Sequence, residues 1–402
     1  MAPISAVYNR NGPYNVVITG STKGVGRALA EEFVKAGDSV VVCSRGPERV
    51  ATAVEELAEL ARSSGRSGVK VAGLPCNVAR PADVAALADF AAEELGHVDL
   101  WINNAGTNAY KYSLLSECTD DEIVSVVETN MLGVLLCCKE AIRIMGKQPT
   151  GGHIFNMDGA GADGGATPRF APYGATKRSL EQLGKSLSAE LRLLGLKDIG
   201  VHNLSPGMVT TELLMAGGSP WEQKRRNPLP DPLIPDPREM ALELGTLAES
   251  MAGEVARAGE MLAAEIEAEV AADLAAEGAL YTRSARGERA RRAVPAAWPA
   301  VGKRFGRTRG GETLESTDLP TAGADNKIAK FFINCLAERP DTVAKFLVPR
   351  IRRVPVSTRA PLGGVGQSAY IRYLTKPKAY KQIIVRLLTG ARKNRFVPED
   401  AA

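Results

Sequence analysis

The chain has 402 residues, of which 45% are hydrophobic and 24% charged, so it can bury a full core divided among about one to three domains. It contains no run of about eighteen apolar residues, which argues against a membrane-spanning helix. The net charge of +4 is unevenly placed, because residues 327–402 hold 16 Lys and Arg against 4 Asp and Glu. The carboxy-terminal end is therefore basic and the remainder acidic.

Residues 1–13 are predicted to form an N-terminal tail, because a strand begins directly after them. They contain neither an apolar signal core nor a long Arg/Ser-rich leader, so the protein either stays where it is made or lacks its leader in this sequence. The 6 cysteines show no CxxC spacing, and the chain contains only 3 histidines. We therefore expect buried, reduced thiols and no metal site.

Short apolar runs alternate with helical patterns from residue 14 to about residue 216. The runs are nearly continuous in apolar residues, which is typical of strands covered on both faces in a parallel sheet. Helical stretches such as ALAEEFVKAG lie between them, with Gly37 as the expected helix terminator. This alternation predicts a doubly wound, Rossmann-type α/β sheet. The predicted strands are 15–19, 39–43, 98–102, 152–157 and 199–204.

Residues 217–325 interrupt this pattern and are predicted to be an insertion. Its first part, 217–237, is rich in proline and charge and is predicted to be a loop. Apolar residues then recur at helical spacing from Met240 to Leu274 on an acidic, alanine-rich background, which predicts an amphipathic helix. The basic stretch 283–311 is typical of a disordered linker. A surface helix on a loose tether is favoured over a catalytic element.

Residues 326–402 are predicted to complete the core and to end in a basic helix. Near the end an apolar stripe at helical spacing stops at Gly390, and cations flank it. Such a helix can lie on an anionic membrane surface, or it can dock on the protein core with its charges solvated; docking is favoured. The stripe is Tyr380, Ile383, Ile384, Leu387 and Leu388, and the flanking cations are Lys378, Lys381 and Arg386.

The stretch TGSTKGVG follows the first strand and opens the first helix, which predicts a dinucleotide site. Gly20, Gly24 and Gly26 allow a tight turn and close approach of the backbone to a pyrophosphate at the helix N-terminus. The spacing is G-x-x-x-G-x-G, so the position between strand and helix carries the assignment rather than the glycines alone. The predicted cofactor contacts here are Gly20, Ser21, Thr22, Lys23, Gly24, Val25 and Gly26.

The second strand ends in Ser44 and Arg45, with no carboxylate. An acid at this place would bind a free ribose 2′-hydroxyl, whereas a cation accommodates a 2′-phosphate. With Lys23 in the glycine turn as a second cation, the pattern favours NADP(H) over NAD(H). The alternative is that both residues are simply exposed cations.

Three further segments are predicted to line the cofactor pocket. One is the CNV step with Asn77 and Val78, where Asn77 is placed to face the adenine. Another is NNAG, which ends the fourth strand and contributes Asn104, Ala105 and Gly106. The third follows the sixth strand: Pro206 and Gly207 shape the loop, while the Val209 backbone and the Thr211 hydroxyl hold the carboxamide and phosphates.

Tyr173 and Lys177 lie one helical turn apart on one face of a predicted helix. A phenol with an ordinary pKa near ~10 is a slow proton donor at neutral pH. The neighbouring ammonium group is expected to favour the phenolate and so to lower that pKa. The pair is therefore predicted to move a proton to or from a substrate oxygen.

In their order, the motifs TGSTKGVG, NNAG, ETNMLG, YGATK and SPGMVTTEL resemble the short-chain dehydrogenase/reductase family over residues 14–215. The stretches GGHIFNMDGAG, TPRFAPYGATKRS, KFFINCLAE and LTGARKNR resemble plant and algal chlorophyll(ide) b reductases, in the soluble non-yellow-coloring-like branch. This similarity resumes after the insertion, and the insertion itself carries none.

The resemblance implies an NADPH-dependent reductase that converts the C7 formyl group of chlorophyll b to a hydroxymethyl group during chlorophyll b breakdown. It implies that Tyr173 and Lys177 are catalytic, that Lys177 also holds the nicotinamide ribose, and that Asn130 supports a water chain to solvent. It further implies a chloroplast location on the stromal face of the thylakoid membrane. The helices around 120–145 and 171–195 are expected to form a homo-oligomer contact, or a contact with a membrane-anchored relative.

The chain lacks the serine that the wider family keeps before the tyrosine. The aligned residue is Asp158 or Gly159, and an ionised Asp158 would repel negative charge developing on the substrate oxygen. Asp158 therefore contacts the substrate oxygen only if it is protonated; otherwise its carboxylate is aimed elsewhere. Tyr173 is predicted to be the main polar contact, aided by water or Thr167, while Gly159 and Gly161 leave room for a flat macrocycle. The alternative is that these glycines only shape a turn.

Two other functions stay open at this point. One keeps the chemistry but uses another hydrophobic carbonyl substrate. The other is an idle pigment-binding partner of a membrane-anchored relative, which the missing serine allows but the intact set of Asn130, Tyr173 and Lys177 opposes.

Overall fold

The computed structural model describes residues 12–109, 113–215, 331, 333–357 and 368–397. The chain divides into two compact units, of which the first comprises residues 1–228, 325–375 and 386–402. The second comprises residues 229–324 and 376–385. The predicted acidic helix and basic linker of the insertion lie outside the described residues.

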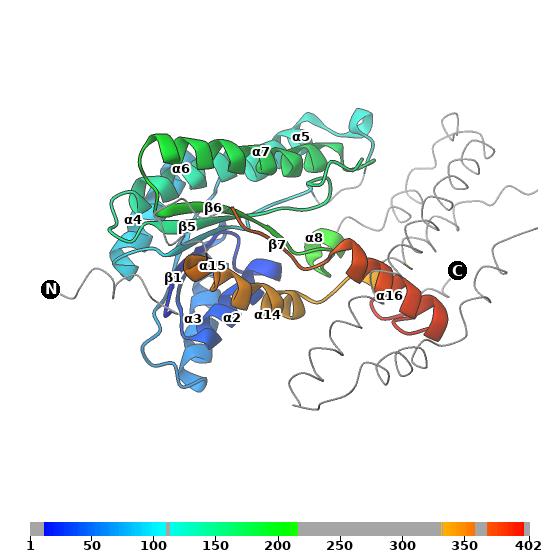
Figure 1. Cartoon of the computed structure of the whole chain (residues 1–402), viewed down its shortest axis with the longest axis horizontal. Helices are drawn as coiled ribbons and strands as arrows, with labels where there is room; N and C mark the ends of the chain where they lie inside the picture. Colours follow the sequence, from blue (N-terminus) through cyan, green and yellow to red (C-terminus); the bar gives the residue numbers. More distant parts are fainter. Residues whose placement is uncertain (1–11, 110–112, 216–330, 332, 358–367, 398–402) are drawn as a thin grey trace, which may run out of the picture. The chain divides into compact units, whose positions relative to one another are not determined.

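The first unit is built on a parallel sheet of seven strands in the order β3-β2-β1-β4-β5-β6-β7 (Figure 1). The order reverses between β1 and β4, so the carboxyl ends of these two strands border a crevice in which such folds bind ligands. The predicted doubly wound α/β fold is confirmed. The strands are β1 (Asn15–Ile18), β2 (Ser39–Ser44), β3 (Val71–Pro75), β4 (Leu100–Asn103), β5 (Gly152–Met157), β6 (Ile199–Ser205) and β7 (Tyr370–Arg372).

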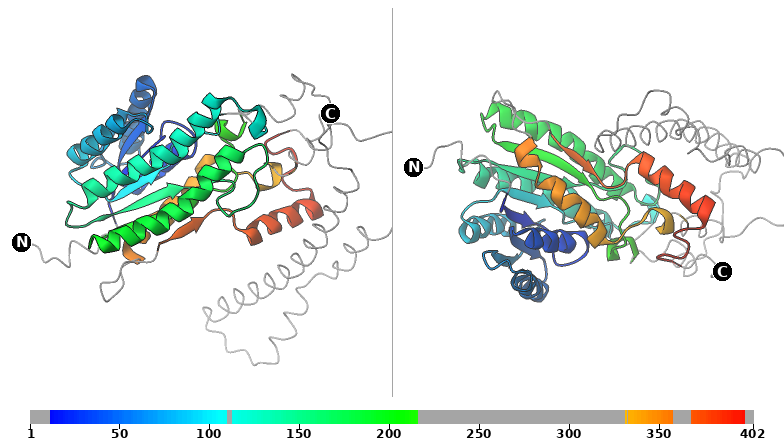
Figure 2. Two further views of the ribbon diagram at one scale, coloured as in Figure 1. Left: turned by 90° about the horizontal axis from the view of Figure 1, so that it is seen from above. Right: turned by 60° about the horizontal axis from the view of Figure 1, so that its bottom comes forward.

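Helices cover both faces of the sheet (Figures 1 and 2). One face packs on α2 (Gly24–Ala36), α3 (Pro47–Ser63) and α14 (Pro340–Ile351). The other packs on α4 (Pro81–Leu95), α6 (Gly133–Met145) and α7 (Ala171–Leu193). The remaining elements are α5 (Asp120–Val127), α8 (Glu212–Met215), α15 (Val354–Ser357), α16 (Lys376–Thr389), the 3-10 turn η1 (Leu115–Glu117) and the π-helical turn η2 (Glu128–Leu132).

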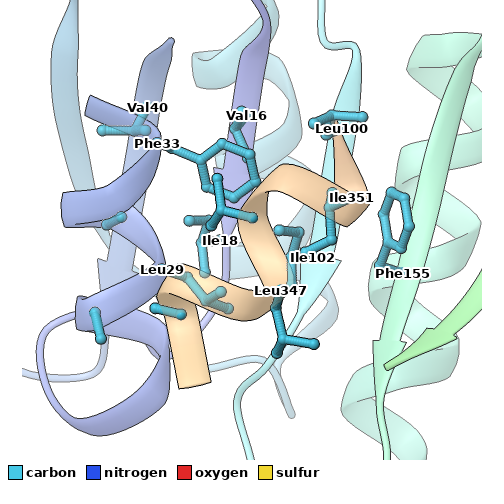
Figure 3. Packing of buried hydrophobic residues seen from close by; sticks show 14 of the residues in the cluster. Val16, Ile18, Leu29, Phe33, Val40, Leu100, Ile102, Phe155, Leu347 and Ile351 are labelled. Atoms are coloured by element: carbon cyan, nitrogen blue, oxygen red, sulfur yellow. The ribbon is translucent and has the colours of Figure 1, made fainter. Parts of the chain in front are cut away.

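Apolar side chains leave each central strand on both faces, which explains the continuous apolar runs. On β1, Val16 and Ile18 point to the face covered by α2 and α14, while Val17 points to the other. Figure 3 shows Leu347 and Ile351 of α14 packed beside this first set. Because α14 follows the insertion in sequence, the chain returns to finish the core of the first unit.

A buried ion pair fixes this returning segment. The Asp38 carboxylate is fully buried at the start of β2 and pairs with Arg352 just after α14, with 2.9 Å between Oδ2 and Nε. The backbone N–H of Tyr14 donates to the same carboxylate at 2.9 Å, and the Tyr14 hydroxyl donates to the Arg352 carbonyl at 3.1 Å. These contacts join the first strand to residues more than 300 positions away in sequence.

The predicted strands agree with the observed ones to within two residues at each end. Gly37 ends α2 in a left-handed conformation with a φ of 91°, as predicted. Two strands have no counterpart among the predicted runs. β3 is the partly exposed sequence VAGLP, and β7 has only three residues, with Tyr370 and Arg372 exposed. Neither has the continuous apolar character that marks the central strands.

The predicted C-terminal helix is present as α16, which ends one residue before Gly390. Whether its apolar stripe meets a membrane surface or the protein core stays a prediction. Among the described residues, no helix combines the length and the apolar character needed to cross a membrane.

Candidate active site

The glycine turn lies between β1 and α2, against the residues that follow β4. Gly20 and Gly24 have φ values of 64° and 59°, a region that other residues adopt at a cost. A Cβ on Gly20 would lie 2.8 Å from the Cα of Ala105, and one on Gly26 would lie 2.4 Å from the Asn104 side chain. Glycine is therefore required at both places for the turn and the NNAG segment to touch.

Several predicted cofactor contacts hold this turn together. The Ser21 hydroxyl is buried and donates to the Ile18 carbonyl at 2.6 Å, and it accepts from the N–H of Cys43 at 3.0 Å. The Asn104 amide donates to the carbonyls of Thr19 and Gly20 at 3.0 and 3.1 Å. Both side chains are thus engaged in shaping the site. Thr22 and Val25 lie partly exposed on either side of Lys23 and Gly24.

The end of β2 presents a buried hydroxyl and an exposed cation. The Ser44 Oγ atom is buried and has no hydrogen-bond partner within the part of the chain that the structure describes. Arg45 beside it is exposed, and Lys23 forms an ion pair with Glu212 of α8. An orphaned buried hydroxyl next to a cation fits a ligand oxygen at this position.

The CNV step contributes one loop-shaping residue and one packing residue. The Asn77 side chain accepts from the N–H of Ala79 at 3.2 Å, and its backbone N–H donates to Asp83 at 2.9 Å. Val78 is buried against Gly133 of α6, where an added Cβ would lie 2.8 Å from its side chain. Contact between Asn77 and an adenine stays a prediction.

The loop after β6 is braced by residues from beyond the insertion. Pro206 is buried, and Gly207 takes a φ of 71° beside Leu374. The N–H of Thr210 donates to the Glu338 carbonyl at 2.9 Å, which forms a parallel bridge at Val209. The Glu338 carboxylate in turn pairs with Arg392 and Arg395 at 2.8 and 2.7 Å.

Thr211 brings this loop to the glycine turn. Its Cγ2 atom lies 3.3 Å from the position of a Cβ on Gly24. Gly106 of NNAG faces Asn130 and Lys177: a Cβ on Gly106 would lie 3.4 Å from the Asn130 Oδ1 atom and 3.6 Å from the Lys177 Nζ atom. The glycine turn, NNAG and the loop after β6 therefore meet at the carboxyl ends of β1 and β4.

Tyr173 stands in the first turn of α7, where Pro172 is favourable because no N–H is needed there. Lys177 lies one turn further on, and its Nζ is 5.5 Å from the centre of the Tyr173 ring. Lys177 is only 4% exposed and donates to the Met157 carbonyl at 2.9 Å. Burial lowers the pKa of Lys177 to about 8, and the negative charge of Asp158 opposes that shift.

Asn130 is fully buried in the π-helical turn η2, a type of distortion that is frequent at functional sites. Its side chain pairs with both backbone groups of Thr107, each at 2.8 Å. Its amide also donates to the Thr176 hydroxyl at 3.2 Å, and Thr176 donates to the Tyr173 carbonyl at 2.7 Å. Asn130 thereby joins the loop after β4 to the helix that carries Tyr173.

Gly159 occupies the place that faces the Tyr173 hydroxyl. A Cβ on Gly159 would lie 2.2 Å from that oxygen and 3.0 Å from the ring carbon that bears it. Asp158 is 4% exposed, and its carboxylate accepts a hydrogen bond from Tyr370 of β7. Of the two ways in which Asp158 could fit the site, the structure has the carboxylate aimed elsewhere, at Tyr370.

Thr167 packs against the start of α7. Its Oγ1 lies 2.0 Å from the position of a Cβ on Gly174, and it donates to the Phe170 carbonyl at 3.5 Å. Gly161 has a φ of 90°, and a Cβ on it would lie 2.8 Å from the Cα of Gly174. These contacts show that Gly161 and Thr167 shape the loop; contact of Thr167 with a substrate oxygen stays a prediction.

A small pocket opens beside Tyr173, with a cavity volume of about 20 Å³. Its walls come from the loop after β4, from α5 and from the start of α7. Arg169 adopts a φ of 64° at its rim, an uncommon conformation for a residue other than glycine. The remaining lining residues are Asn108, Ala109, Ser113, Cys118, Glu122, Ile123, Val126, Phe170, Pro172 and Tyr173.

Comparison with known proteins matches residues 14–220 to the family described as short chain dehydrogenase. The chain belongs to the short-chain dehydrogenase family. It is 40% identical to "Chlorophyll(ide) b reductase NOL, chloroplastic" of Arabidopsis thaliana over 96% of this chain and 78% of that protein. The protein of the same name from Oryza sativa subsp. japonica is 39% identical over 96% and 79%. "Probable chlorophyll(ide) b reductase NYC1, chloroplastic" of Arabidopsis thaliana is 48% identical over 52% and 44%.

Membership of this family makes the chain an oxidoreductase that uses a nicotinamide dinucleotide. The glycine turn before α2, which leaves no room for a side chain at Gly20 or Gly26, suits such a cofactor. The predicted residues Tyr173, Lys177 and Asn130 are brought together with the glycine turn, NNAG and the loop after β6. Sequence reasoning missed Tyr370, Glu338 and the pocket wall from α5. No local signal marks Tyr370, since it stands 212 positions from Asp158.

We expect Gly159→Ser to lower kcat by about 100-fold or more, although it restores the residue type of the wider family. The new Cβ must displace the Tyr173 hydroxyl, and a misplacement of about 1 Å costs about that much. The measurement is carbonyl-dependent oxidation of the reduced cofactor, together with a melting curve to verify folding.

Gly165→Ser is the matched control, because a Cβ there meets only Asp163, at 3.3 Å, on the exposed loop. The control should keep wild-type activity. A Gly159→Ser enzyme as active as the wild type would contradict the assignment of Gly159.

Proposed function

We propose that this protein is an NADPH-dependent reductase that converts the C7 formyl group of chlorophyll(ide) b to a hydroxymethyl group, in chlorophyll b degradation. The observation that carries the proposal is the similarity to two chlorophyll(ide) b reductases over 96% of the chain, which includes the segment after the insertion. The site supports the reaction type, because reduction of an aldehyde requires a hydride donor and a placed proton donor.

The chain's own residues supply the proton and its environment. Tyr173 donates its proton to the formyl oxygen as negative charge develops there. The Lys177 ammonium ion, held on the Met157 carbonyl, stabilises the phenolate that remains. Asn130 keeps the loop after β4 and the start of α7 in register. Bound NADPH supplies the hydride.

The surroundings of Tyr173 suit a wide, flat substrate. Gly159 places no side chain over the tyrosine hydroxyl, so in this proposal a ring-borne aldehyde approaches it edge-on. The adjoining pocket has a volume of only about 20 Å³, so in this proposal the macrocycle lies outside it. Thr167 or a water molecule provides the secondary contact to the substrate oxygen.

NADPH is the preferred donor in this proposal. Ser44, with its unpaired buried hydroxyl, and Arg45, with its exposed guanidinium group, together suit a 2′-phosphate. Lys23 provides a further cation once the phosphate competes with Glu212 for it. The described end of β2 offers no carboxylate to a free 2′-hydroxyl.

The protein acts, in this proposal, in the chloroplast on the stromal face of the thylakoid membrane, as a dimer of this chain or with a membrane-anchored relative. The relatives are named chloroplastic. Helices α5 and α6 and the turn between them expose an apolar stripe that a partner would cover. Sedimentation of the pure protein tests self-association. The stripe comprises Val124, Val127, Met131, Leu132 and Leu135, each 39–49% exposed.

Purified protein incubated with chlorophyll b or chlorophyllide b and NADPH should convert the formyl pigment to the hydroxymethyl pigment, followed by absorbance. Tyr173→Phe should lower that rate by about 1,000-fold, since it removes the proton donor and leaves the ring. NADPH oxidation with other carbonyls alone would select another substrate class, and pigment binding without turnover would select an idle binding partner. Either result contradicts the proposal.

Replacement of Arg45 tests the choice of cofactor. Arg45→Asp should raise the KM for NADPH by about 10- to 100-fold and lower that for NADH, because a charge-assisted contact to the 2′-phosphate becomes repulsive. Arg62→Asp, at the far exposed end of α3, is the control and should change neither KM. Equal use of NADH and NADPH by the wild type would overturn this part of the proposal.

A further inference from the structure

A buried carboxylate, that of Asp158, lies at the end of β5 and has no part in the mechanism above. Asp158 follows the last residue of β5, and the Lys177 ammonium ion is bound to the carbonyl of the residue before it, Met157. Both charged groups are only 4% exposed. A buried ammonium ion tends to lose its proton unless a negative group compensates it, and Asp158 is the charged group that raises the Lys177 pKa.

The Asp158 carboxylate accepts a hydrogen bond from the edge strand of the sheet. The Tyr370 hydroxyl donates to it from β7, the edge strand that pairs with β6 after the insertion (Figure 1). The Arg372 guanidinium group lies 4.0 Å from the centre of the Tyr370 ring. Burial raises the pKa of Asp158, and the Tyr370 hydrogen bond and the positive charges of Lys177 and Arg372 oppose this.

We propose that Asp158, oriented by Tyr370, is a positioning residue that keeps the buried Lys177 ammonium ion protonated and fixed beside Tyr173. The groups around this carboxylate are Lys177 from α7, Tyr370 and Arg372 from β7, and the neutral Ser205 hydroxyl from β6. Its hydrogen bond to Tyr370 also turns it away from the place where a substrate oxygen gains negative charge. The segment after the insertion thereby takes part in setting the protonation of the catalytic lysine.

The inference rests on the proposed reductase function and predicts a change in its pH profile. In the wild type kcat for reduction should fall as pH rises through about 8, where Lys177 loses its proton. Asp158→Asn should move that alkaline limb down by about one pH unit, which lowers the rate at pH 7 by about half and changes it little below about pH 6. Tyr370→Phe removes a hydrogen-bond donor that favours the ionised Asp158 carboxylate. The alkaline fall of kcat should therefore move to lower pH in this variant as well, by less than in Asp158→Asn.

The double variant separates this role from general damage. If Tyr370 acts through Asp158, the variant with both changes should match Asp158→Asn alone, whereas independent effects would add. Tyr373→Phe is the matched control, because it removes a phenol hydroxyl from the same segment. In this variant kcat should still fall near pH 8. Unmoved limbs in Asp158→Asn and Tyr370→Phe, or additive shifts in the double variant, would overturn the proposal.

A second readout needs no substrate and therefore does not depend on the proposed function. For each protein, the unfolding free energy is measured against pH with and without Lys177→Met, and the difference isolates Lys177. The folded pKa of about 8 lies below the ordinary 10.5, so the unfolded chain binds more protons between these values. The Lys177 contribution to stability should therefore rise with pH from about 8 in the wild type, and from about one unit lower in Asp158→Asn.

The proposal is supported if the pH at which the Lys177 contribution to stability begins to rise agrees with the pH at which kcat falls. If Asp158→Asn leaves the first of these pH values unchanged, the proposal is refuted, even if chlorophyll b is reduced. If that pH value moves while no pigment is reduced, the proposed function fails and the role of Asp158 stands.

Discussion

The burial of one ammonium ion, that of Lys177, is the constraint to which the rest of the site is fitted. A cation that is 4% exposed must have acceptors and a compensating charge, or it deprotonates. The Met157 carbonyl supplies the acceptor and Asp158 the charge, and both lie at the carboxyl end of β5. Tyr173, one helical turn away, then has a positive neighbour when its proton leaves.

The topology brings the other parts of the site to the same edge of the sheet. The strand order reverses between β1 and β4, and the glycine turn and NNAG touch there. The segment after the insertion contributes three contacts to the first unit. Helix α14 covers one face, Glu338 braces the loop after β6, and Tyr370 reaches Asp158. Sequence far from the motifs therefore fixes the residues within them.

The loss of the family's serine has a simple steric counterpart. At Gly159 a side chain would occupy the space of the Tyr173 hydroxyl, so glycine at this position makes room for that hydroxyl. The acidic residue beside it is kept away from that space by its hydrogen bond to Tyr370. The two residues thus have different roles. Gly159 leaves space for the Tyr173 hydroxyl, and the negative charge of Asp158 compensates the Lys177 ammonium ion.

Local patterns were enough to predict the central strands, the glycine turn and the pairing of Tyr173 with Lys177. Each depends on residues that are adjacent in sequence or one helical turn apart. Tyr370 and Glu338 could not be predicted in this way, because their partners lie across the insertion and no spacing rule connects them. The edge strand β7 was missed because three residues with two exposed polar side chains carry no strand signature. The role of Asp158 was left undecided because its direction depends on that same strand.

The central claim is that Tyr173 passes its proton to the formyl oxygen of a ring-borne aldehyde. A crystal structure of the complex with oxidised cofactor and chlorophyllide b tests this most directly. The account predicts the Tyr173 Oη atom within hydrogen-bond distance of that oxygen, about 2.6–3.2 Å, with Lys177 behind the phenol. A formyl oxygen far from Tyr173, with no bridging water and another side chain donating to it, would contradict the account.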